Sequence, residues 1–256
     1  MTPSPQLFSS QNRYNALWMM LDIECTSLDY TSPDFGILEI AASVVDDAME
    51  VIDTFHVIVH QNARIIGNSS RWCKQRFRSR LEGGNDLFAQ CELSTITEEM
   101  AGAMLEAFIL KHAKKRQPAA GSEHDAQKRN LFRAAEFEPI DALVAHEVVD
   151  GPAEEVAPPK QQMKVESTGM EHYRIMLAGC SVYFDRAVLL HCYPRLRMYI
   201  GHKTIELSSL LEIVRRWRPD LLRSLPPTQE CHRALVDVME AVSLLRWFWR
   251  SFLVSV

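Results

Sequence analysis

Two carboxylates interrupt an otherwise apolar stretch near the start of the chain. Residues 17–28 read LWMMLDIECTSL, in which Asp22 and Glu24 follow a run typical of a buried β-strand. Strand side chains alternate between the two faces of a sheet, so residues two apart point the same way and these carboxylates converge. Burying two like charges is unfavourable unless a cation lies between them. The stretch therefore predicts a divalent metal site whose remaining ligands come from elsewhere in the chain.

The composition is that of a globular intracellular protein. The chain has 256 residues, 47% of them hydrophobic, which suffices for one large domain or two small ones. Its net charge of −5 gives no global basic field for long nucleic acid but permits a short anionic substrate. Six scattered cysteines show neither zinc-ligand nor disulfide spacing, which indicates reduced thiols. No apolar run is long enough for a membrane span, so we expect a cytoplasmic or mitochondrial protein with no membrane partner.

The order of predicted elements favours a mixed α/β fold. Apolar runs at residues 37–47 and 54–61 follow the first strand at short intervals, which predicts an antiparallel three-strand start. A helix is predicted to open at a capping box, Thr95 to Glu98. Further on, the pattern predicts a buried strand ending at Gly179, a helix stopped by Pro194, a helix with Ser208 as N-cap ending before Pro219, and a long final helix after Cys231.

One domain accounts for most of the chain. We expect it to span residues 15–256, after a disordered N-terminal tip at residues 1–14. Residues 117–170 hold five prolines among mixed charges and show no sustained period. This stretch is predicted to be a low-order insertion within the domain.

Further polar residues lie where predicted elements end or begin. Asp185 follows the buried strand, and His232 and Asp237 stand where the last helix opens. Taken singly, they have ordinary interpretations as a helix N-cap, a loop histidine and a solvated helix residue. Taken together with the first-strand pair, and in this order, they give the chain a pattern that resembles the DEDD exonucleases of the ribonuclease H-like fold. It resembles the branch marked by His-x-x-x-x-Asp and, within that branch, the oligoribonucleases; the resembling stretches are DIECTSLD, ILEIA, VIVHQ, RWCK, LAGCSVYFD, TIELS, RRWRP and HRALVD.

The resemblance implies a 3′→5′ exoribonuclease that hydrolyses short oligoribonucleotides to 5′-mononucleotides, working as a homodimer. Asp22, Glu24, Asp185 and Asp237 would bind two divalent ions, Mg²⁺ or Mn²⁺, and His232 would be the general base. Hard cations prefer such oxygen ligands, and two ions about 4 Å apart can activate a water and stabilise the leaving oxygen. A histidine that titrates near neutral pH can accept the proton of that water.

The resemblance also assigns contacts to the substrate. Leu28 would wedge against a base, and Trp72 would line the site. Ser181 and Ser208 would help to hold the 5′-phosphate of a dinucleotide. These four residues match the family pattern.

Other positions depart from that pattern. Where the family has a tyrosine from the partner subunit and an arginine, this chain has His202 and Lys203, and lysine lacks the two-pronged phosphate grip of arginine. The remaining departures are Phe77 for histidine, Cys180 for asparagine, Glu206 for aspartate and Val236 for the first aspartate of a pair. None removes a predicted metal ligand, but two alternatives stay open. One is an exonuclease for longer RNA or single-stranded DNA, and the other is a non-catalytic interaction protein that docks through the insertion.

Overall fold

The computed structural model describes residues 17–46, 48–113, 175–229 and 231–253. All described elements belong to one unit, formed by residues 1–116 and 171–256. The predicted N-terminal tip and the predicted insertion at residues 117–170 lie outside the described residues. The elements are β1 (Trp18–Cys25), β2 (Ile37–Val45), β3 (Val51–Ile58), α1 (Ala63–Gly67), α2 (Arg71–Arg76), η1 (Arg80–Glu82), α3 (Leu87–Leu93), α4 (Glu98–His112), β4 (Ile175–Gly179), α6 (Val182–Cys192), η3 (Pro194–Met198), β5 (Ile200–Glu206), α7 (Leu207–Trp217), η4 (Pro219–Ser224), α8 (Ala234–Phe248) and η5 (Trp249–Leu253).

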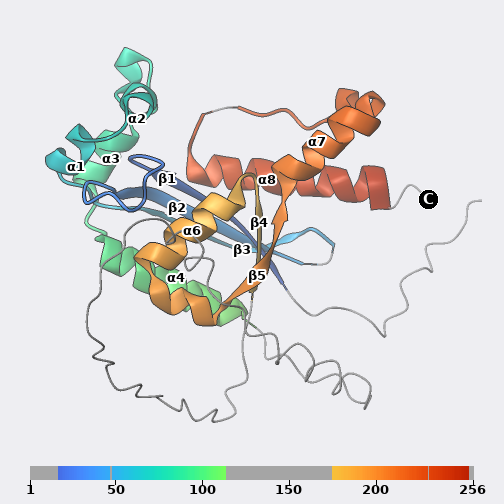
Figure 1. Cartoon of the computed structure of the whole chain (residues 1–256), viewed down its shortest axis with the longest axis horizontal. Helices are drawn as coiled ribbons and strands as arrows, with labels where there is room; N and C mark the ends of the chain where they lie inside the picture. The colour runs from blue at the N-terminus through green and yellow to red at the C-terminus, as the bar shows by residue number, and fades with distance from the viewer. Residues whose placement is uncertain (1–16, 47, 114–174, 230, 254–256) are drawn as a thin grey trace, which may run out of the picture. The chain divides into compact units, whose positions relative to one another are not determined.

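A five-stranded mixed sheet forms the centre of this unit, in the order β3-β2-β1-β4-β5 (Figure 1). The predicted antiparallel meander is formed by β1, β2 and β3. The other pairs, β1 with β4 and β4 with β5, are parallel. This mixed sheet with flanking helices confirms the predicted α/β class and its antiparallel three-strand start. Because β1 and β4 are parallel neighbours, the polar residues that follow them meet at the same edge of the sheet.

The alternation of side chains along β1 divides the core into two layers. Met19, Leu21 and Ile23 pack with α4 and α6 against one face of the sheet. Met20 packs with α7 and α8 against the other face. Residues in phase with Met20 therefore face α8, and these include both carboxylates of the strand.

The first long helix begins later than the capping box predicted. α4 starts at Glu98, and its N-cap is Thr97, whose hydroxyl accepts a hydrogen bond from the backbone N–H of Met100 at 3.2 Å. Thr95 is therefore not the cap. The Glu98 carboxylate does not reach back to the helix start, because it accepts a 2.6 Å hydrogen bond from the side chain of Gln61.

The predicted cap of α7 is also wrong by two residues. The N-cap is Glu206, the last residue of β5, whose carboxylate accepts from the backbone N–H of Ser208 at 3.3 Å. Ser208 lies inside the first turn. A carboxylate at a helix N-terminus is favoured by the helix dipole, which explains why Glu206 takes this place.

Short helices fill the polar segment between β3 and α4, where no periodicity predicted them. Asn62 and Ser70 cap α1 and α2 through their side chains. Phe77 and Leu87 anchor the segment in a small separate core beneath Leu38. All six cysteines are free, as their spacing predicted. Within the described ranges, no helix has the length and apolar character needed to cross a membrane.

Candidate active site

A carboxylate cluster is built where the end of β1 meets the start of α8. Asp22 and Glu24 face α8, and only 8% of the Glu24 surface is exposed. Asp237 lies in the first turn of α8, and His232 lies just before the helix. Ligand atoms of Glu24, His232 and Asp237 all lie within 4.8 Å of one another. The structure thus brings together residues from the two ends of the described chain.

Asp185 lies beside the cluster, at the junction between β4 and α6. It lies in the first turn of α6, which follows β4 directly, and only 5% of its surface is exposed. Burial is the main reason that its pKa is raised well above the ordinary value, and the charge of Asp22 is the next. A hydrogen bond involving the backbone of Ile23 opposes this rise. Asp185, a predicted metal ligand, therefore lies close enough to Asp22 for the two carboxylates to interact electrostatically.

Burial and mutual repulsion also raise the pKa of the other carboxylates. Burial, followed by the charge of Asp237, raises the pKa of Asp22 to about 8. The pKa of Glu24 lies well above its usual range, first through burial and then through Asp22 and Asp237. Burial and two neighbouring glutamates raise the pKa of Asp237 to about 6. Among the described residues, no lysine or arginine forms an ion pair with Asp22, Glu24, Asp185 or Asp237.

The donor set fits a divalent cation. Carboxylate oxygens are the ligands that hard cations prefer, and an imidazole nitrogen is an accepted additional ligand of transition metals. A bound cation also removes the repulsion that raises the pKa of each carboxyl group. Glu24, His232 and Asp237 lie close enough together to hold such an ion.

Of the predicted base contacts, Trp72 lies next to the cluster. Its ring centroid is 5.0 Å from that of His232, with the two rings nearly perpendicular at 86°. Trp72 is 49% exposed, and the Arg76 guanidinium lies over its ring, 5.7 Å from the centroid. Leu28 lies on the loop after β1 and is 82% exposed. Contact with a base would remove apolar surface of Leu28 from water, which favours binding.

The two predicted phosphate-binding serines share one acceptor. The Glu206 carboxylate accepts a hydrogen bond from the Ser181 backbone N–H at 2.6 Å and one from the Ser208 hydroxyl at 2.7 Å. Ser181 has a left-handed backbone, with φ of 56°. Glu206 therefore sets the spacing of these serines. His202 and Lys203 are exposed on β5, and within the described ranges neither forms a hydrogen bond or ion pair with the carboxylate cluster.

Polar residues that the sequence did not single out hold the histidine loop. Glu39 of β2 pairs with Arg233, and Asn85 binds backbone carbonyls of residues 231 and 232. One signal could have found Glu39. It is a carboxylate in the run ILEIAASVV, which is otherwise apolar or small, just as Asp22 is in its strand.

Comparison with known proteins supports the sequence pattern. No family model matches the chain. It is 23% identical to the oligoribonuclease of Chromobacterium violaceum over 246 residues, which cover 95% of this chain and 98% of that relative. It is 37% identical to the oligoribonuclease of Corynebacterium glutamicum over 79 residues, which are 31% of this chain but only 36% of that relative. A solved structure of E. coli exonuclease I with a dT13 oligonucleotide is more distant, with a TM-score of 0.48 and 11% identity over 93% of this chain and 41% of that one.

The chain is similar to oligoribonuclease over nearly its whole length. The oligoribonuclease resemblance predicted from the motifs is therefore confirmed. One departure from the oligoribonuclease pattern can be explained. Phe77 is fully buried and meets the Trp72 ring edge-on at 5.7 Å, so it supports that ring by packing. Val236 borders a hollow beside the histidine loop, and nothing in the structure explains its place in the pattern.

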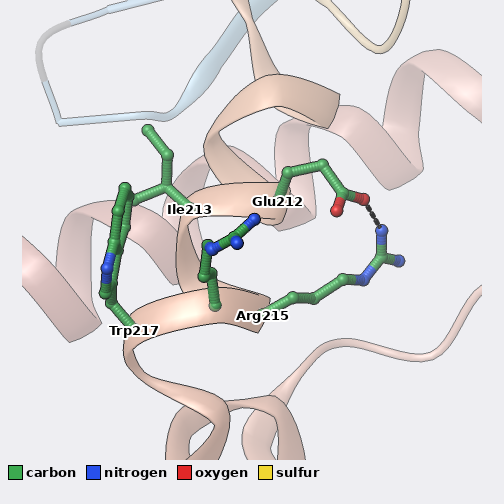
Figure 2. A pocket seen from close by; sticks show the side chains of 5 residues that line it. Glu212, Ile213, Arg215 and Trp217 are labelled. Atoms are coloured by element: carbon green, nitrogen blue, oxygen red, sulfur yellow. Dashed lines mark hydrogen bonds and ion pairs between the residues drawn. The ribbon is translucent and has the colours of Figure 1, made fainter.

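A second hollow, of about 340 Å³, lies on α7 and is lined only by residues of that helix (Figure 2). Ile213 and Trp217 lie one turn apart along it, and Glu212 forms an ion pair with Arg215. None of the predicted site residues lines this hollow. The exposed Glu212–Arg215 pair therefore offers a control for substitutions in the site.

Proposed function

We propose that the protein is a divalent-metal-dependent 3′→5′ exonuclease that hydrolyses short oligoribonucleotides to 5′-mononucleotides. One observation carries this proposal, namely the convergence of Glu24, Asp237 and His232 within 4.8 Å. Asp22 and Asp185 are near enough to raise the pKa of Glu24. The whole-length similarity to oligoribonuclease points to the same chemistry.

The carboxylates and the histidine have separate roles in this reaction. Asp22, Glu24, Asp185 and Asp237 hold two divalent ions, Mg²⁺ or Mn²⁺. When bound, such ions supply Lewis-acid stabilisation of charge on the phosphoryl and leaving oxygens. His232 accepts a proton from the attacking water as the water oxygen bonds to phosphorus. The bond from phosphorus to the 3′-oxygen breaks, and that oxygen takes a proton from solvent, so the released nucleotide keeps a 5′-phosphate.

The exposed residues around the cluster bind the nucleotide. Trp72 stacks on a base through the exposed part of its ring, and Leu28 wedges against a base. The Ser181 hydroxyl donates to the phosphate, and the Ser208 hydroxyl, which donates to Glu206 in the free protein, turns to the phosphate when the nucleotide binds. Base–aromatic stacking of this kind contributes about 1–3 kcal/mol per base.

A labelled ribodinucleotide incubated with Mn²⁺ tests the proposal. The wild-type protein should release labelled mononucleotide, and Asp22→Ala should reduce the rate by at least about a thousandfold, since it removes a metal ligand. The matched control is Asp220→Ala, because Asp220 pairs with Arg218 on the surface and is not part of the cluster. Equal rates for Asp22→Ala and Asp220→Ala would sink the idea.

Longer RNA or single-stranded DNA is a second candidate substrate. The observation that favours it is the presence of His202 and Lys203 where the oligoribonuclease pattern has tyrosine and arginine, because lysine lacks the two-pronged phosphate grip of arginine. A weaker grip on the 5′-phosphate would limit substrate length less strictly. Cleavage rates on a dinucleotide and a twenty-mer separate the two cases, because a strong dinucleotide preference rejects the longer substrate.

We also propose a homodimer in which His202 reaches the partner's site, as the oligoribonuclease resemblance implies. Sedimentation of the purified protein measures the oligomeric state directly, and a monomer at micromolar concentration contradicts this part. A non-catalytic interaction protein is the remaining alternative. Isothermal titration with Mn²⁺ addresses it, because binding at two sites is expected of the enzyme and absence of binding would favour the interaction protein.

A further inference from the structure

Glu39 is a buried carboxylate that lies beside the cluster but does not share its chemistry. Only 1% of its surface is exposed, in a strand whose residues are all buried. It lies directly opposite Glu24 in the pairing of β1 with β2, so both side chains point to the same face of the sheet. A second carboxylate at this place adds to the repulsion within the cluster, and indeed it raises the pKa of Asp22. The unfavourable repulsion from Glu39 must therefore be offset by other interactions of its carboxylate.

The Glu39 carboxylate is saturated with donors from elsewhere. Arg233 binds it with two nitrogens, Nε to Oε2 at 2.9 Å and Nη2 to Oε1 at 3.0 Å. The backbone N–H of Ala234 donates to Oε2 at 3.1 Å, and the His56 ring lies 2.6 Å from Oε1. Burial alone would raise the pKa of Glu39, but the hydrogen bonds of His56 and Arg233 outweigh burial and lower it. Glu39 thus stays ionised, with its oxygens directed to the residues that follow His232.

The loop around His232 is held from both sides. Downstream, Glu39 binds Arg233 and the first N–H of α8. Upstream, the Asn85 amide donates to the carbonyls of Cys231 at 3.0 Å and His232 at 2.8 Å. His232 itself has a left-handed backbone, with φ of 50°. A non-glycine residue keeps such a conformation only when its surroundings over-determine it.

Packing supplies only part of this restraint. The His232 ring meets the Trp72 ring edge-on at 5.0 Å, but a hollow of about 500 Å³ borders the loop, and its lining includes Glu39, Asn85 and Arg233. The loop thus has open space beside it into which it can move. Polar contacts oppose that movement, namely those of Glu39 and Asn85 and the 2.9 Å hydrogen bond from Arg233 to Gln90.

We propose that Glu39 is a positioning residue that, through Arg233, fixes His232 against the carboxylate cluster. The proposal rests on the function proposed above, in which His232 accepts the proton of the attacking water. Glu39 does not touch substrate or metal in this account. Its effect reaches the reaction only through the place of the His232 ring.

Two substitutions test whether Glu39 acts on His232 through Arg233. Glu39→Gln keeps the size of the side chain but removes the charge and presents an amide N–H₂ to the donors of the loop. We expect kcat on a dinucleotide to fall by about 10–100-fold, since small displacements of a reacting group have effects of this size, and KM to change less than about twofold. Arg233→Lys keeps the charge and loses the fork, so a smaller fall is expected. Glu212→Gln, which breaks the exposed pair of Figure 2, is the matched control and should leave both constants unchanged.

A double-substitution cycle distinguishes positioning from general loss of structure. In a His232→Ala background, Glu39→Gln should have almost no further effect on kcat, because the group it positions is gone. An equal fall in both backgrounds overturns the proposal. If Glu39→Gln does not fold, Arg233→Lys decides, and an unchanged kcat for it overturns the proposal as well.

A spectroscopic readout separates this proposal from the proposed function. In protein labelled with ¹³C-histidine, the ring signal of His232 is assigned by its loss in His232→Ala. We expect that signal to move in Glu39→Gln and to stay in place in Glu212→Gln, whether or not the protein cleaves RNA. An unmoved signal refutes the positioning role, whereas an inactive wild-type protein refutes the exonuclease and leaves the signal to decide the role of Glu39.

Discussion

Replacing Asp22 by asparagine is expected to change stability with opposite sign in the absence and presence of metal. The folded protein raises the pKa of Asp22 from 3.8 to about 8. Between these two values the folded state binds more protons than the unfolded state, so stability falls as the pH rises through that window. Asparagine carries no charge and removes this dependence.

The magnitude follows from the size of the shift. About three pH units separate 3.8 from pH 7, and each corresponds to about 1.4 kcal/mol, which gives about 4 kcal/mol for Asp22 alone. Asp237 carries part of the same repulsion, so we expect Asp22→Asn to recover about 1–2 kcal/mol in metal-free protein. For a chain of this size, that raises Tm by about 2–8 °C. With Mn²⁺ at one hundred times its Kd, binding stabilises the wild-type protein by about 2.7 kcal/mol, and the variant loses most of this gain.

The assay is thermal unfolding at pH 7, with EDTA or with Mn²⁺, of wild type, Asp22→Asn and the surface control Asp220→Asn. Asp22→Asn should unfold above wild type in EDTA and below it in Mn²⁺. The control should differ little from wild type in both, since Asp220 is an exposed residue paired only with Arg218. The reasoning is refuted if Asp22→Asn lowers Tm in EDTA, because the carboxylate would then stabilise the metal-free fold.

Further outcomes follow from the same geometry. Mn²⁺ affinity should rise between pH 6 and pH 8, because Asp22, with a pKa of about 8, and Asp237, with a pKa of about 6, must lose protons to bind the ion, and calorimetry in two buffers should detect their release. Trp72→Ala should raise KM for a dinucleotide by about tenfold or more with a smaller change in kcat, measured by steady-state kinetics, and an unchanged KM excludes stacking on this ring. Glu206→Ala removes the acceptor that the two serines share, so it should raise KM for a substrate with a 5′-phosphate more than for one without, and equal changes contradict a phosphate-binding role.

The sequence predicted four strands of the sheet and the long helices because their periodicity is strong and local, but it did not predict β5. The meander of β1 to β3 and the helices α6, α7 and α8 all lie where alternation or helical spacing placed them. The helices α1 to α3 were missed, since each is short and depends on packing near Leu38, and α1 and α2 depend on side-chain caps as well. The start of α4 was misplaced because a contact with Gln61, distant in sequence, engages the Glu98 carboxylate.

The candidate site was predictable where a residue conflicts with its surroundings. Asp22 and Glu24 stood out as charges in a buried strand, and the structure places Glu24 beside Asp237 and His232. The supports of the histidine loop were not predictable in this way. Glu39 and Arg233 are 194 residues apart, and Asn85 acts on backbone carbonyls that carry no sequence signal. Such contacts depend on the tertiary fold.

Metal dependence of hydrolysis tests the central claim most directly. The measurement is the release of mononucleotide from a labelled ribodinucleotide by protein first stripped with EDTA and then returned to Mn²⁺, for wild type and for Asp185→Asn, whose carboxylate is 5% exposed in the cluster. The carboxylate site predicts no release in EDTA, full recovery of the wild type in Mn²⁺ and no recovery of the variant. Release that persists in EDTA, or that Asp185→Asn recovers as fully as wild type, contradicts a metal-dependent exonuclease built on these carboxylates.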